Sequence, residues 1–302
     1  MAESTLQASI ALGTQKAMEA LDRRRAAFAT RAQALAVRAG REDATLATAS
    51  VAPSAGLLIA EGDSWFDYPF HDVLKELEDL HGFDVESVAH KGDRVEDMAY
   101  SDGQLDDFTR RIEKVVRRGD QPKAILLSGG GNDIAGDEFG MLLNHAASAR
   151  RGLNQQVVRG IIEERLYDAY ATIIAAITAV CERTLGSRIP ILVHGYGYAV
   201  ADGRGFLGGA WILPGPWLEP GFIQKGYLDM AQRQPLMRDL IDQFNAMLQS
   251  ITSAPQFSHV KHIDLRADLA TYPANYKMDW GNELHPTERG FATVAARFAA
   301  AL

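Results

Sequence analysis

The chain has 302 residues, of which 47% are hydrophobic and 23% charged, a mix that can build one large globular domain or two small ones. Its formal net charge of −8 argues against nucleic-acid binding, because no basic surplus is available to neutralise phosphates. A single cysteine, Cys181, cannot form an internal disulfide, and no Asp, Glu or His set has metal-ligand spacing.

The first 50 residues are expected to form a helical extension. Residues 5–40 are rich in helix-forming Ala, Leu, Arg and Gln, and Leu21, Phe28 and Leu35 recur at heptad spacing. Arginines between these positions do not support a sustained coiled coil, so we expect a helix that lies against the main domain. The alternative is a helix that pairs two copies of the chain into a homo-oligomer. Neither a secretory signal nor a transmembrane segment is visible, so we expect a cytoplasmic protein.

A linker at 47–56 leads into the main domain, for which we expect residues 51–302. Short apolar runs predict strands at 57–60, 84–90, 123–130, 189–196 and 259–265. Helical spacing predicts helices at 71–82, 106–119, 155–185, 234–251 and 286–302. This alternation is typical of βαβ units, which form an α/β fold with a mostly parallel sheet and helices on both faces. Ligands bind such sheets beyond the carboxyl ends of the strands.

Candidate catalytic residues follow these strands. Ser64 comes after the first strand in "EGDSW", Gly92 after the second, and Asn132 after the third in "GGGND". His285 precedes the last helix in "NELHPTERGF". A serine becomes a nucleophile beside a neutral imidazole, and the amide of Asn132 with the backbone N–H groups of Gly92 and Ser64 can stabilise an oxyanion. The structural alternative for Ser64 is the N-cap of a following helix.

These four blocks, taken in order, resemble those of the SGNH (GDSL) hydrolases, a family of serine esterases and lipases. They span residues 62–291. The resemblance implies a flavodoxin-like three-layer α/β/α sandwich with strand order 2-1-3-4-5, and ester hydrolysis through an acyl-enzyme without metal or cofactor. It also implies Ser64 as nucleophile, His285 as base, and an oxyanion hole formed by Ser64, Gly92 and Asn132. We expect activity to rise with pH through an ordinary histidine pKa of about 6–7.

The sequence departs from the family pattern at Asn282, which stands where the family has an aspartate, three residues before His285. A neutral amide cannot stabilise an imidazolium by charge, and in a serine protease this change costs about 10⁴ in kcat. Asn282 can orient His285 in a dyad-like site, or a supporting acid, Asp279 or Asp264, or a carbonyl near Trp280 can replace the aspartate. The third alternative is a catalytically silent domain that binds a ligand or partner.

Two connections are long, those at 134–155 and 201–227. Loops of this length at a functional edge often close over a site. We expect a substrate pocket lined by Trp211 and Trp217 of the second loop and by His194 and Tyr196 at the fourth strand end. The alternative is that these side chains pack onto the core. An apolar pocket favours a carboxylesterase or lipase acting on small-molecule or lipid-like esters; a sugar-ester deacetylase or lysophospholipase uses the same machinery.

Overall fold

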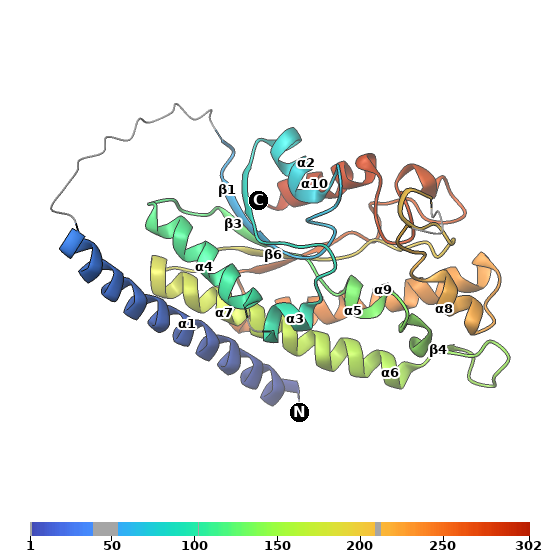
Figure 1. Cartoon of the computed structure of the whole chain (residues 1–302). Helices are drawn as coiled ribbons and strands as arrows, with labels where there is room; N and C mark the ends of the chain where they lie inside the picture. Colours follow the sequence, from blue (N-terminus) through green and yellow to red (C-terminus); the bar gives the residue numbers. More distant parts are fainter. Residues whose placement is uncertain (1, 39–53, 102, 209–212) are drawn as a thin grey trace.

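The computed structural model describes residues 2–38, 54–101, 103–208 and 213–302 (Figure 1). At its centre lies a five-stranded sheet of order β2-β1-β3-β6-β7, and every pairing is parallel. The strands are β1 (Leu57–Glu61), β2 (Asp84–Ser87), β3 (Ala124–Leu127), β6 (Ile191–Gly195) and β7 (Val260–Asp264). The predicted α/β fold and strand order are therefore confirmed.

Helices cover both faces of this sheet (Figure 1). One face carries α2 (Val73–His81) and α10 (Glu288–Ala301), and the other carries α3 (Val95–Tyr100), α4 (Gln104–Arg117), α7 (Tyr167–Leu185) and α9 (Met230–Thr252). Because both faces are covered, successive residues of the central strands are buried instead of alternating between buried and exposed. Ile59, Leu126 and Val193, one from each of three adjacent strands, are almost completely buried.

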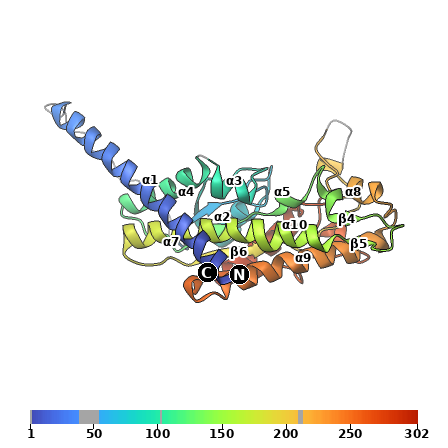
Figure 2. The ribbon, with the colours of Figure 1, turned by 90° about the horizontal axis from the view of Figure 1, so that it is seen from below.

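The helix α1 (Ala2–Arg38) lies across α7 (Figure 2). Its Leu6, Ala17 and Leu21 belong to the core cluster. A side chain at Gly13 would collide with the backbone carbonyl of Thr172, so the two helices approach closely here. Residues 169–181 of α7 are all buried as a result, as expected for a helix that is apolar all round.

The N-terminal helix thus lies against the main domain, as one of the two alternatives predicted. Arg24 strengthens the contact, since its guanidinium pairs with Glu113 and with Asp106 of α4. The other two positions of the predicted stripe, Phe28 and Leu35, lie outside the residues whose side chains the structure describes. Pairing of two copies through α1, and the domain boundaries, stay predictions.

Several elements differ from the predicted boundaries. The helix predicted at 155–185 is divided into α6 (Gln155–Arg159), a π-helical segment (Gly160–Leu166) and α7. Short elements that carry no periodic pattern were not predicted. They are α3, α5 (Gly131–Ile134), α8 (Glu219–Gln224), the hairpin of β4 (Leu143–Asn144) and β5 (Gly152–Leu153), and 3₁₀ turns at Phe139–Leu142, Phe206–Gly208, Pro255–Phe257 and Tyr276–Met278.

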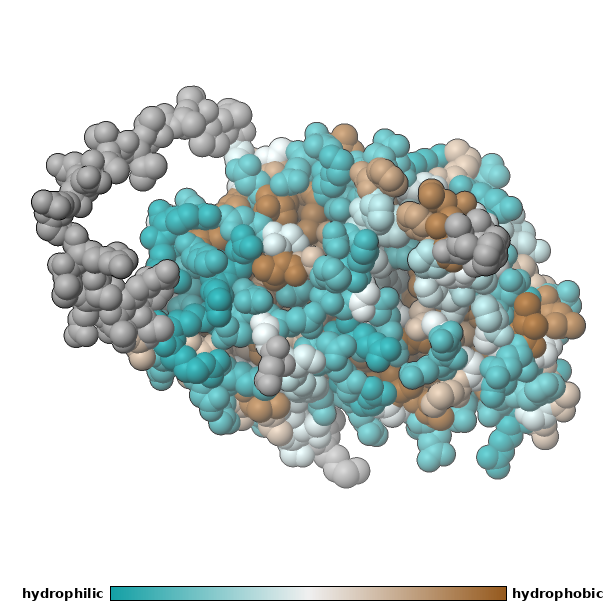
Figure 3. Space-filling model, viewed as in Figure 1, coloured by the Kyte–Doolittle hydropathy of each residue, from teal (hydrophilic) through white to brown (hydrophobic). Residues whose placement is uncertain are grey.

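In the view of Figure 3, hydrophilic and hydrophobic patches alternate over the surface, and one hydrophobic patch lies at the end of the molecule that carries α8. Exposed apolar side chains at that end include Ile223 and Leu228. In the described part of the chain, no helix is both long and apolar enough to cross a membrane.

Candidate active site

Ser64 lies in a turn that follows β1, not at the start of a helix. The next helix, α2, begins at Val73, and its N-cap is Asp72, whose carboxylate accepts the N–H of Lys75 at 2.8 Å. The N-cap alternative for Ser64 is therefore wrong. The turn is shaped instead by the neighbouring Asp63.

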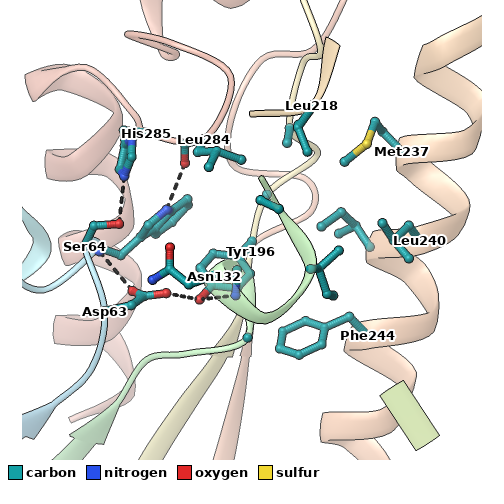
Figure 4. Close-up of a pocket in the computed structure, with 18 of the residues that line it drawn as sticks. Asp63, Ser64, Asn132, Tyr196, Leu218, Met237, Leu240, Phe244, Leu284 and His285 are labelled. Carbon is teal, nitrogen blue, oxygen red and sulfur yellow. Dashed lines mark hydrogen bonds between the residues drawn. The ribbon is translucent and has the colours of Figure 1, made fainter. Parts of the chain in front are cut away.

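Asp63 is buried directly behind the serine. Its Oδ1 accepts the N–H of Trp65 at 3.0 Å and the hydroxyl of Ser128 at 2.8 Å, while the hydroxyl of Tyr196 donates to its Oδ2. The Tyr196 hydroxyl in turn accepts the backbone N–H of Gly131 at 3.1 Å (Figure 4). One buried network therefore joins the turn of Ser64 to α5, the short helix that carries Asn132. Burial raises the pKa of Asp63, and the hydrogen bonds that it accepts oppose that rise.

His285 is placed to act as a base. Its Nε2 lies 2.7 Å from the Oγ of Ser64 (Figure 4). Its Nδ1 lies 3.0 Å from the Oδ1 of Asn282. The same Oδ1 accepts the backbone N–H groups of Leu284 and His285, each at 2.9 Å, so the amide presents its oxygen and not its NH₂. Nδ1 therefore carries the proton, and Nε2 is free to accept one from Ser64.

Burial lowers the pKa of His285 to about 3, well below the 6–7 expected from an ordinary histidine. The imidazole is therefore neutral over the whole physiological range, as a base must be. The same burial disfavours the imidazolium that forms once the proton is taken up.

The supporting acids proposed from sequence do not contact His285. Asp279 accepts the backbone N–H of Ala270 at 2.8 Å, and Asp264 forms an ion pair with Arg266 at 2.5 Å. Both predictions are corrected, because each carboxylate already has partners away from the imidazole. Among the residues that the structure describes, the amide of Asn282 takes the place of the acid.

Asn132 and Gly92, which were expected in the oxyanion hole, line one pocket together with Ser64. The NH₂ of Asn132 donates one hydrogen bond to the carbonyl of Asp93 at 2.9 Å, which orients the amide and leaves its second proton for an oxyanion. Gly92 has a φ of +93°, a conformation that glycine adopts readily, and it lines the same pocket as Ser64 and Asn132.

Two pockets meet at the serine, and Ser64, Asn132, Leu284 and His285 line both. The inner pocket, of about 60 Å³, is apolar and lies between the sheet edge and α9 (Figure 4). Its far wall is formed by Leu218, Met237, Leu240, Ile241 and Phe244. The outer pocket has a volume of about 370 Å³ and is lined by Tyr68, Pro69, Lys91, Gly92, Phe206, Leu213, Pro214 and Trp217.

The four residues that were expected from sequence to line the pocket lie in different places. Tyr196 lines the inner pocket, and Trp217 lines the outer one with its edge toward His285 at a centroid distance of 5.6 Å. Trp211 lies outside the described residues. His194 lines neither pocket, which corrects that expectation: it is fully buried and its Nε2 is hydrogen-bonded to the Oγ of Ser128 at 2.8 Å.

Glu283 is a site residue that sequence reasoning missed. It is fully buried, and its carboxylate accepts four backbone N–H groups at 2.6–3.0 Å, those of Gly203, Trp217, Leu218 and Glu219. It thereby joins the loop of His285 to the segment that lines both pockets. The nearby Arg204 adds a second connection through the carbonyls of Trp280 and Gly281.

The apolar wall of α9 was also missed, because its spacing is equally typical of a helix that faces the core. Only the topology brings Leu240 and Phe244 toward Ser64. No cluster of His, Cys, Asp or Glu in the described ranges is arranged to hold a metal ion.

The sequence was also compared with known protein families and with known proteins. The sequence model of the GDSL-like Lipase/Acylhydrolase family matches residues 48–293. No curated protein matches the chain.

Among solved structures, the chain is similar to a catalytic mutant of Axe2, an acetylxylan esterase from Geobacillus stearothermophilus, with 16% identity over 82% of this chain and 94% of that one and a TM-score of 0.41. It is also similar to a lipolytic protein of the G-D-S-L family from Veillonella parvula, with 14% identity over 80% of this chain and 94% of that one and a TM-score of 0.40. At these scores the likeness carries no argument about substrate.

Proposed function

Because this chain belongs to the GDSL-like Lipase/Acylhydrolase family, we propose that it is a serine-dependent ester hydrolase that forms an acyl-enzyme on Ser64 with His285 as base. The observation that carries the proposal is the 2.7 Å hydrogen bond between Ser64 Oγ and His285 Nε2, at the junction of two pockets. A nucleophile in contact with an oriented base is the arrangement that acyl transfer needs.

In the proposed reaction, His285 Nε2 takes the hydroxyl proton of Ser64 as Oγ attacks the ester carbonyl carbon. The resulting oxyanion accepts hydrogen bonds from the backbone N–H groups of Ser64 and Gly92 and from the free N–H of Asn132. His285 then returns the proton to the leaving alkoxide, and the alcohol departs. Water enters, gives a proton to His285 and attacks the acyl carbon. The bond between the acyl carbon and Oγ then breaks, His285 returns the proton to Oγ of Ser64, and the acid is released.

The two pockets favour an acyl group on the inner side and the alcohol on the outer side. The inner pocket is closed at its far end by α9 and measures about 60 Å³. An apolar cavity of about 150 Å³ holds one benzene ring. We therefore propose esters of short acyl groups, acetyl to butyryl, as substrates, while the larger outer pocket accepts the alcohol.

The test is hydrolysis of p-nitrophenyl acetate, butyrate and octanoate by the wild type and by Ser64→Ala. We expect acetate and butyrate to be hydrolysed faster than octanoate, and the variant to lose about 10⁴-fold or more in kcat. The matched control is Ser101→Ala, because Ser101 is an exposed residue after α3 that lines neither pocket.

Turnover that persists in folded Ser64→Ala would contradict the proposed nucleophile. No turnover of any ester by the folded wild type would favour the alternative of a silent binding domain. A rate that increases toward octanoate would contradict only the short acyl group.

A further inference from the structure

The ring of Tyr68 lies flat against the imidazole of His285. The two ring centroids are 4.1 Å apart and the planes are inclined by 19°. Phe206 and Phe291 contact other sides of the Tyr68 ring, at centroid distances of 5.8 and 5.9 Å. These neighbours come from separate segments of the chain and fix the orientation of the stacked ring.

The hydroxyl of Tyr68 contacts Asn282, the residue that is also hydrogen-bonded to Nδ1 of His285. Asn282 Nδ2 donates to the Tyr68 hydroxyl at 3.0 Å, while Asn282 Oδ1 faces His285 Nδ1. Asn282 is only 2% exposed, so without Tyr68 its NH₂ group would be buried with one partner fewer, which is destabilising. Tyr68 therefore contacts both the base, His285, and the residue that orients it, Asn282.

Proton transfer from Ser64 produces a positive charge on His285, and little in the surroundings compensates it. Burial disfavours the charged ring, and Asn282 carries no charge. Among the residues that the structure describes, no carboxylate is hydrogen-bonded or ion-paired to His285. An aromatic face attracts a cation that lies within about 6 Å of its centroid, and more strongly where water is excluded. Burial raises the pKa of Tyr68, so its ring remains a neutral phenol.

We propose that Tyr68 is a positioning residue that allows an amide to replace the acid of the triad: its ring face stabilises the His285 imidazolium, and its hydroxyl satisfies the amide of Asn282. This inference rests on the proposed function. This chain lacks the aspartate that the family has at the position of Asn282, and an aromatic ring from a different segment compensates for its absence.

The kinetic test compares Tyr68→Phe and Tyr68→Leu in the wild type and in Asn282→Asp. Loss of the ring in Tyr68→Leu is expected to lower kcat about 30-fold, with a smaller effect on KM, whereas Tyr68→Phe keeps the ring and stays within about threefold. With Asn282→Asp, a carboxylate supplies the charge, so the cost of Tyr68→Leu shrinks to about threefold.

The matched control is Tyr100→Leu, an aromatic-to-leucine change in α3 at a residue that lines neither pocket; its kcat should equal that of the wild type in both backgrounds. A merely structural role of Tyr68 predicts the same loss in both backgrounds. That outcome, with all variants folded by thermal melting, overturns the proposal.

A second measurement needs no turnover. Trifluoroacetone forms a hemiketal adduct with an activated serine, and NMR titration of that adduct gives the pKa of the His285 imidazolium. We expect this pKa to fall by about one unit in Tyr68→Leu and to stay unchanged in Tyr68→Phe. An adduct whose pKa is the same in all three proteins overturns the role of Tyr68 alone. Failure of Ser64 to form the adduct overturns the proposed function itself.

Discussion

Asn132 combines a structural and a proposed catalytic hydrogen bond in one NH₂ group. The donation to the Asp93 carbonyl fixes where the second proton points, so the oxyanion donor is oriented before substrate arrives. Donors of this kind cost no reorganisation during the reaction, which is why they contribute strongly.

We therefore expect Asn132→Ala to lower kcat about 10²- to 10³-fold with little change in KM, measured with p-nitrophenyl acetate. Asn144→Ala is the matched control, since Asn144 belongs to the β4–β5 hairpin and lines neither pocket. A loss below about threefold in folded Asn132→Ala would mean that the amide is not an oxyanion donor.

At the scale of single residues, the sequence predicted the positions that come together around Ser64, because each stands at a strand end or directly before a helix. It did not predict Tyr68 or Glu283. Both act through contacts with distant segments, and neither belongs to a local pattern. The supporting acids were wrong because neither closeness in sequence to His285, as for Asp279, nor a place at a strand end, as for Asp264, fixes the direction of a side chain.

The elements around the site are joined by Glu283. Its carboxylate is the acceptor for four backbone N–H groups of the segment 203–219, and it lies between two residues of the catalytic loop, Asn282 and Leu284. Oxygens of a carboxylate can only accept, which suits a site where four donors converge.

The change Glu283→Gln places an NH₂ group among those donors, so some of them lose their acceptor. We expect the free energy of unfolding to fall by about 3 kcal/mol and hydrogen exchange to accelerate in residues 203–219 but not in β1 or β3. Thermal melting and hydrogen-exchange mass spectrometry measure both effects. Glu138→Gln, at an exposed position, is the control, and equal exchange in the two variants would show that Glu283 does not hold this segment.

The elements themselves were predictable where the pattern was long enough. Helices of three turns or more and the buried strands were found from periodicity, with boundaries in error by a few residues. The inner pocket could not be predicted, because α9 has the apolar spacing of any helix that faces the core. Which part of that apolar face meets the sheet and which part meets the site depends on the crossing of the helix over β6 and β7.

Over the whole molecule, buried histidines limit stability at low pH and a buried glutamate limits it at high pH. Burial lowers the pKa of His194 and of His285 to about 3, so below the ordinary value of 6.5 the unfolded chain binds protons that the folded chain does not. Burial, with the nearby Asp93, raises the pKa of Glu61 from 4.5 to about 9, so above pH 4.5 the folded chain keeps a proton that the unfolded chain releases.

The two histidines lower stability as pH falls below about 6.5, and Glu61 lowers it as pH rises above about 4.5. Between these values two histidines outweigh one glutamate, so we expect the highest melting temperature near pH 6.5. Glu61→Gln retains an oxygen for the N–H of Gly62 and removes the titration, so the decline between about pH 6.5 and pH 9 should become smaller by more than about 1.4 kcal/mol. Melting curves across this range measure it. An unchanged alkaline slope in the variant would contradict the role of Glu61.

The family match begins at residue 48, but the packing of the molecule begins earlier. The face of α7 that packs against α1 includes Ala175 and Ala179, and in a chain shortened to the matched residues it would be exposed to water. Exposed apolar surface favours association, so we expect the shortened chain to associate with itself or with other apolar surfaces. For this protein, the residues that match the family are therefore fewer than the residues that we expect to be needed to prevent association.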